Sequence, residues 1–144
     1  MIRSLVQMLF LTTSLAASAQ TRLSAVEQQI ISQVNKNIPQ SLKLMEDLVN
    51  INSGTLNIEG VKKTGAVLRK QFDSIGFKTE WITLPDSLKR AGHLVASIKG
   101  TKGKKLFLIG HLDTVFEPDS SFILYRLLDD FTGTGQGASD MKGG

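Results

Sequence analysis

The sequence has 144 residues, of which 41% are hydrophobic and 21% are charged, and it contains no cysteine. This is the composition of a globular protein, and it argues against a disordered chain or a scaffold held together by disulfides. The formal charge of +4 is spread along the chain and aromatic residues make up only 6%, so we expect no nucleic-acid surface.

Residues 1–19 have the pattern of a secretory signal peptide. Arg3 supplies the positive start, residues 5–15 are apolar but too short to span a bilayer, and Ala17-Ser18-Ala19 is a small-x-small cleavage pattern. The alternative is a retained amphipathic helix. We expect cleavage after Ala19 and an exported protein, periplasmic or secreted, made of residues 20–144. No cysteine follows the cleavage site, so a stable membrane anchor is not expected.

Two helices are predicted next. Ser24 and Glu27 form an S-x-x-E capping box that opens a helix ending near residue 37. Pro39 is expected to separate this helix from a second one, residues 40–49, because proline disrupts a helix interior.

A third helix is expected after Asn57, which can cap it, and Gly76 supplies its stop signal. Residues 77–84 and 93–99 then alternate well enough for two strands, with Trp81 packed against the sheet. A further short strand is predicted at residues 122–128. His93 stands at a strand start, and we expect it to lie outside any site.

The central feature is an unbroken apolar run, residues 106–109, followed by Gly110, His111, Leu112 and Asp113. Such a run is typical of a strand buried on both faces. Side chains alternate along a strand, so His111 and Asp113 fall on one face. Ligands bind at the carboxyl ends of strands in open α/β sheets. The pair therefore fits a metal-bound histidine oriented by a neighbouring carboxylate, although a solvated strand end is the simpler interpretation of an isolated H-x-D.

A glycine-rich loop, residues 133–144, closes the sequence as GTGQGASDMKGG, and Asp140 lies within it. Together, GHLDTV and GQGASDMKGG resemble the paired motifs of the dinuclear zinc aminoacylase/carboxypeptidase family of metallopeptidases. That family includes glutamate carboxypeptidase, acetylornithine deacetylase, succinyl-diaminopimelate desuccinylase and several dipeptidases. The resemblance extends over roughly residues 42–144. One departure is Gln136, where relatives often carry arginine.

The resemblance implies an α/β fold, a three-layer α/β/α sandwich of the zinc exopeptidase type. It also implies that His111 ligates one Zn²⁺, that Asp140 bridges two, and that Asp113 is a catalytic residue behind the His111 ring. Co²⁺ or Mn²⁺ could substitute. The expected reaction is hydrolysis of an amide bond, in a peptide or N-acyl amino acid with a free carboxylate, by a metal-bound hydroxide.

The family also uses a Glu–Glu pair containing the general base, another acidic ligand and a late histidine, all after the glycine loop. The sequence stops at Gly144, before these positions. We therefore expect residues 20–144 to be the amino-terminal portion of the catalytic domain, inactive alone and without the inserted lid or dimerisation domain. For the complete enzyme, the resemblance leaves both a monomer and a homodimer as alternatives.

Two other classes remain as alternatives. A non-catalytic metal- or peptide-binding protein of the same fold would carry the same two motifs. A dinucleotide-binding module would use residues 133–138, which fit G-x-G-x-x-A, but that motif should follow a buried strand directly, and here Asp129 and Asp130 precede it. We expect this acidic pair to form a solvated turn.

Overall fold

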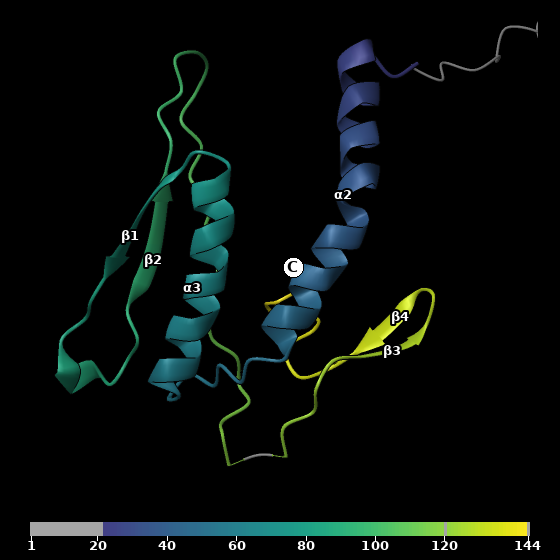
Figure 1. Ribbon diagram of the computed structural model, residues 1–144. Coiled ribbons are helices and arrows are strands. Elements are labelled where there is room, and N and C mark those ends of the chain that lie inside the picture. The colour runs from purple at the N-terminus through teal and green to yellow at the C-terminus, as the bar shows by residue number, and fades with distance from the viewer. Residues whose placement is uncertain (1–21, 120, 144) are drawn as a thin grey trace, which may run out of the picture. The chain divides into compact units, whose positions relative to one another are not determined.

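The computed structural model describes residues 22–119 and 121–143 (Figure 1). The predicted signal peptide and its cleavage site lie outside these residues. The chain divides into two units, residues 1–38 and residues 39–144. No helix within the described residues is both long enough and apolar enough to cross a membrane.

Helix α2 spans Ala25–Val49 and begins with the predicted capping box. The backbone N–H of Ser24 donates to Glu27 Oε2 at 2.7 Å, and the backbone N–H of Glu27 donates to Ser24 Oγ at 3.3 Å. The hydrogen bond from Ser24 lowers the pKa of Glu27, because it stabilises the ionised carboxylate.

The prediction that Pro39 ends a helix is wrong, since Pro39 lies inside α2. A proline removes one backbone donor at a cost of about 3 kcal/mol, but it does not have to break a helix when the flanking residues favour one. The segment after Pro39 contains leucine, lysine, methionine and glutamate, and it lacks a glycine that would terminate the preceding turn. Its last residues, Leu48 and Val49, are buried.

Helix α3 spans Ile58–Ser74 and starts where the sequence predicts. The side chain of Asn57 accepts a hydrogen bond from the backbone N–H of Gly60 at 3.1 Å, which satisfies one of the free donors of the first turn. At the other end, Gly76 has a φ of 87°, a left-handed conformation that suits glycine.

Strands β1 (Lys78–Ile82) and β2 (His93–Ser97) pair in antiparallel register, with a short 3₁₀ helix, Asp86–Leu88, between them. Both strands contact α3 (Figure 1). The indole N–H of Trp81 donates to the carbonyl of Ala91 at 2.9 Å, and its ring lies against Gly65 of α3. Trp81 therefore joins the sheet to the helix.

Residues 106–109 differ from the prediction of a buried central strand. They form no strand, and their four apolar side chains are 81–83% exposed. A strand buried on both faces needs a ladder partner and covering layers. Within the described residues the only pairing near this run is one parallel bridge, between Gly54 and Thr114. Without a partner, the run has no backbone ladder to hold it extended.

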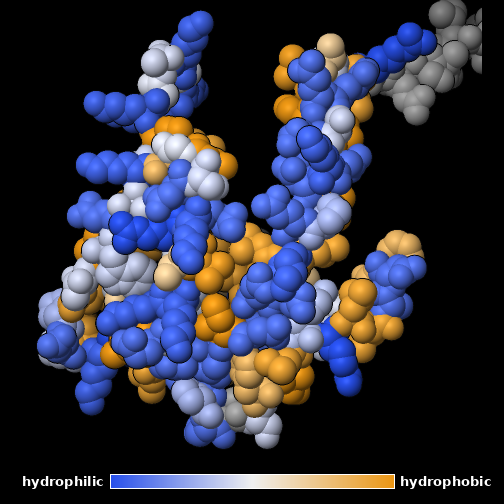
Figure 2. Space-filling model, in the orientation of Figure 1, coloured by the Kyte–Doolittle hydropathy of each residue, from blue (hydrophilic) through white to orange (hydrophobic). Residues whose placement is uncertain are grey.

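Strands β3 (Arg126–Asp129) and β4 (Thr132–Thr134) form a separate antiparallel hairpin. The predicted strand at residues 122–128 is therefore shifted toward the C-terminus. Figure 2 shows apolar residues on the surface of this hairpin, and Phe131 at its tip is 98% exposed. The described residues form two small sheets, which do not test the predicted three-layer sandwich. That fold stays a prediction.

Candidate functional site

The segment carrying His111 and Asp113 is held by residues 51–55, which follow α2. The backbone N–H of Thr114 donates to the carbonyl of Ser53 at 2.8 Å, and the N–H of Thr55 donates to the carbonyl of Thr114 at 3.0 Å. Gly54 lets the two backbones approach, because a Cβ at this position would lie 2.6 Å from the carbonyl oxygen of Phe116. Thr114 is consequently buried, with 6% exposure.

His111 and Asp113 are in contact, although the segment that carries them does not form the predicted strand. Nδ1 of His111 lies 3.0 Å from the backbone oxygen of Asp113 and 3.2 Å from its Oδ1. Both of these oxygens are acceptors, so Nδ1 carries the proton and donates it. On its other side, Asp113 Oδ2 accepts a hydrogen bond of 2.7 Å from the hydroxyl of Thr55. The carboxylate is thus fixed between a hydroxyl and the imidazole.

Asp140 faces the opposite edge of the same imidazole. Its Oδ1 lies 3.2 Å from Nε2 of His111, although the two residues are 29 positions apart in the chain. The glycine-rich loop brings it there through a turn in which the N–H of Lys142 donates to the carbonyl of Gly137 at 3.1 Å. The predicted site residues His111, Asp113 and Asp140 therefore lie together.

The three groups influence one another's ionisation. Partial burial lowers the pKa of His111, but hydrogen bonds with Asp113 and Asp140 outweigh this and raise the pKa above its usual value. Partial burial raises the pKa of Asp113, but the hydroxyl of Thr55 and the His111 ring together lower it below the usual value. The ring favours a cation because carboxylates lie at both of its nitrogens.

This arrangement has the donor chemistry of a metal site. When only Nδ1 is protonated, Nε2 of His111 and the Asp140 carboxylate are both hydrogen-bond acceptors and face each other. A proton or a metal cation between them is then needed to offset their repulsion. Two atoms that each lie about 2.0–2.1 Å from one tetrahedral zinc ion are separated by about 3.3–3.4 Å. The observed separation of 3.2 Å is that of a hydrogen bond between the protonated ring and the carboxylate, and it is also close to the separation of two ligands of one zinc ion.

The donor set is nevertheless small. Within residues 22–119 and 121–143, no three His, Cys, Asp or Glu side chains are grouped so that they could hold a metal ion. Asp113 lies at the other ring nitrogen and does not add a third donor. Among the described residues, His111 and Asp140 therefore supply at most two donors to a metal ion.

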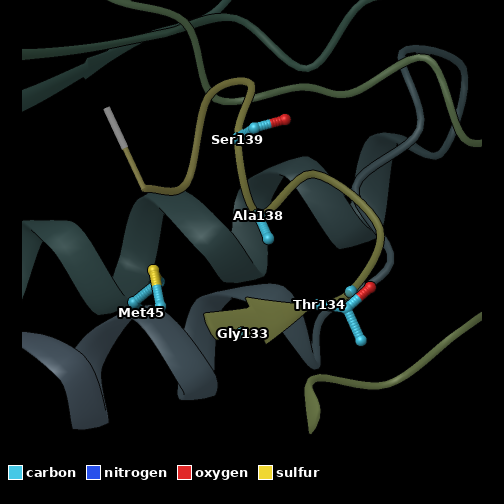
Figure 3. Close-up of a pocket in the computed structure, with 6 residues that line it drawn as sticks. Met45, Gly133, Thr134, Ala138 and Ser139 are labelled. Atoms are coloured by element: carbon cyan, nitrogen blue, oxygen red, sulfur yellow. The ribbon is translucent and has the colours of Figure 1, made fainter. Parts of the chain in front are cut away.

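A shallow hollow of about 250 Å³ lies on another side of the glycine-rich loop. Met45 of α2 and loop residues line it, including Gly133, Thr134, Ala138 and Ser139 (Figure 3). None of the three site residues lines this hollow. The loop starts in β4 of an antiparallel hairpin, and residues 136–143 form turns. This context does not match the strand–loop–helix unit that a dinucleotide-binding motif requires.

Comparison with known proteins gives one informative similarity. No family model matches the sequence. The chain is 33% identical over 106 residues to Carboxypeptidase G2 from Pseudomonas sp. (strain RS-16). The chain is similar to a carboxypeptidase. The match covers 74% of this chain but 25% of Carboxypeptidase G2, so the chain spans about a quarter of the length of that relative. At the coarse level, this similarity supports a hydrolase of the peptidase kind.

Sequence reasoning did not assign a role to Thr55 or Lys142. Thr55 lies in the segment Ser53-Gly54-Thr55, which follows α2, and its hydroxyl donates to Asp113. Lys142 is buried, with 6% exposure, and its ammonium donates to the carbonyl of Ile51. Burial lowers the pKa of Lys142 to about 8.

The remaining titratable groups noted in the sequence lie elsewhere. His93 is exposed at the start of β2. Asp129 ends β3, and its side chain accepts a hydrogen bond of 2.8 Å from the N–H of Phe131 in the hairpin turn. This hydrogen bond lowers the pKa of Asp129. Asp129 and Asp130 are both exposed and belong to this turn, as predicted.

Proposed function

We propose that this chain carries part of the active site of an exported zinc-dependent peptidase or amidohydrolase. The observation that carries the proposal is the position of His111 between two carboxylates, Asp113 at Nδ1 and Asp140 at Nε2. The similarity to Carboxypeptidase G2 supports a peptidase-type reaction. The proposed substrate is a peptide or N-acyl amino acid with a free carboxylate.

Each residue has a defined task in this proposal. His111 and Asp140 would hold a metal ion through Nε2 and the carboxylate, and Asp140 would also serve a second ion. Asp113 accepts a hydrogen bond from the Nδ1–H group. This hydrogen bond fixes the ring and would direct the Nε2 lone pair toward the metal position. Zinc, when bound, lowers the pKa of its water to about 7 and polarises the amide carbonyl. Thr55 keeps the Asp113 carboxylate ionised and in place.

We propose further that residues 20–144 are the amino-terminal part of a three-layer α/β/α catalytic domain. Support comes from the two-donor site and from a match that spans a quarter of the relative's length. Catalytic zinc sites usually have three protein ligands, so two donors should bind zinc weakly, and the chain alone should be inactive.

Zinc titration of the chain with two histidine variants tests the site. The sequence contains two histidines, and the exposed His93 provides a matched control. We expect His111→Ala to abolish zinc binding and His93→Ala to leave it unchanged. Equal zinc affinity in His111→Ala and the parent chain would overturn the assignment. Hydrolysis of an N-acyl glutamate by the chain alone would overturn the proposal that the chain is inactive by itself.

A further inference from the structure

Residues 51–55 contact both segments that carry site residues. Thr55 donates to Asp113 at 2.7 Å, and Ser53 accepts from the backbone of Thr114 at 2.8 Å. Ile51 accepts a hydrogen bond from the ammonium of Lys142, which lies 91 positions further along the chain. One short segment therefore fixes the His111 side and the Asp140 side of the site relative to each other.

Asp140 is not held in place by burial of its own side chain, which is 81% exposed. Its support comes from its neighbours in the loop. Gly137 has a φ of 80°, and a Cβ there would lie 2.8 Å from Cγ2 of Thr114 and 3.5 Å from Cδ of Lys142. The loop is thus packed on Thr114 on one side and on the Lys142 stem on the other.

Lys142 is unusual because lysine is rarely buried unless its ammonium is paired. Taking an ammonium group out of water is costly, and only strong acceptors offset that cost. Its acceptor, the carbonyl of Ile51, lies just beyond the end of α2, where the helix dipole and free carbonyl groups favour a cation. A lysine needed only for solubility would not occupy this position.

We propose that Lys142 is a positioning residue. By binding the carbonyl of Ile51, it anchors the glycine-rich loop to the segment that also holds Asp113, and this anchor sets the distance between Asp140 and His111. The effect of Lys142 on the site passes through the backbone between residues 140 and 142.

The test compares Lys142→Met with the parent chain in two measurements. Methionine keeps the apolar stem and removes the ammonium. The first measurement is the affinity for zinc, at a temperature well below the melting temperature of both proteins. This measurement rests on the proposed function, because it requires that the chain binds zinc. The second is the NMR spectrum of the two imidazoles without metal, which does not rest on it. Lys63→Met, an exposed lysine of α3, controls for the loss of one positive charge.

We expect zinc affinity to fall about 10-fold or more in Lys142→Met, within the range of changes behind metal ligands. The His111 signals should shift, while those of His93 should not. Lys63→Met should match the parent in both measurements. A lower melting temperature with unchanged affinity and unchanged His111 signals would mean that Lys142 is only structural, which would overturn the inference.

The two measurements separate failure of this inference from failure of the proposed function. If the parent chain binds no zinc, the proposed metal site is wrong, and unchanged His111 signals in Lys142→Met would still overturn the positioning role. If Lys142→Met does not fold, Lys142→Gln takes its place, because it keeps a neutral donor. Parent-like affinity and His111 signals in Lys142→Gln would then overturn the need for the charged anchor.

Discussion

Gly65 offers a direct test of how α3 packs on β1. An alanine Cβ at this position would overlap Cζ3 of Trp81, lie 3.0 Å from Cη2 of the same ring, and lie 3.2 Å from Cδ1 of Leu112. The indole cannot move away freely, because its N–H donates to the carbonyl of Ala91 at 2.9 Å. The predicted change is therefore a loss of stability in Gly65→Ala.

Two effects oppose each other in this variant. Replacing glycine by alanine inside a helix stabilises it by about 1 kcal/mol. Overpacking a close contact costs about 1–3 kcal/mol, and loss of the Trp81 hydrogen bond would add about 1 kcal/mol. We expect the packing and hydrogen-bond costs to exceed the helix gain, so that the free energy of unfolding falls by about 1–3 kcal/mol.

Urea unfolding followed by fluorescence measures this change directly, because Trp81 is the single tryptophan in the sequence. The exposed Ala66 in the same helical turn supplies the control. Ala66→Gly should lower the unfolding free energy by about 1 kcal/mol through helix propensity alone. If Gly65→Ala instead raises stability by a similar amount, the close packing of Trp81 on α3 is refuted.

Three further changes have defined outcomes. Asp113→Asn should weaken zinc binding about 10–100-fold, because the amide no longer offers a charged acceptor to Nδ1 of His111, and titration at parent affinity would contradict this. Asn57→Ala should lower the urea midpoint by an amount equivalent to about 1 kcal/mol, since the N–H of Gly60 loses its acceptor, and an unchanged midpoint would argue against the cap. Phe107→Lys should reduce self-association measured by sedimentation, because it interrupts four exposed apolar residues, and an identical size distribution would show that this run does not drive association.

Local patterns in the sequence predicted local structure well. The capping box at Ser24, the cap at Asn57 and the contact between His111 and Asp113 follow from interactions within a few residues, and each is present. The approach of Asp140 to His111 could not be derived from spacing, because it depends on how a loop of 12 residues folds, and the resemblance to a family suggested it.

Features that depend on distant partners could not be predicted in the same way. The apolar pattern of residues 106–109 shows that their side chains suit a buried strand. A strand also needs a neighbouring backbone to pair with. The anchor formed by Lys142 joins residues 91 positions apart, and a lysine in a glycine-rich loop gives no sign of burial. At Pro39, the local pattern predicted a break that does not occur. The helix-forming residues on both sides of Pro39 continue α2 through it.

The geometry of the site does not depend on the strand that the sequence predicts before it. Residues 106–109 are exposed and unpaired within the described part of the chain, yet His111, Asp113 and Asp140 are already in contact. Their positions come instead from residues 51–55, through backbone bonds to Thr114, the hydroxyl of Thr55 and the anchor of Lys142. Within the described part of the chain, the site residues are therefore held by hydrogen bonds to residues 51–55, and no pairing of residues 106–109 contributes to their positions.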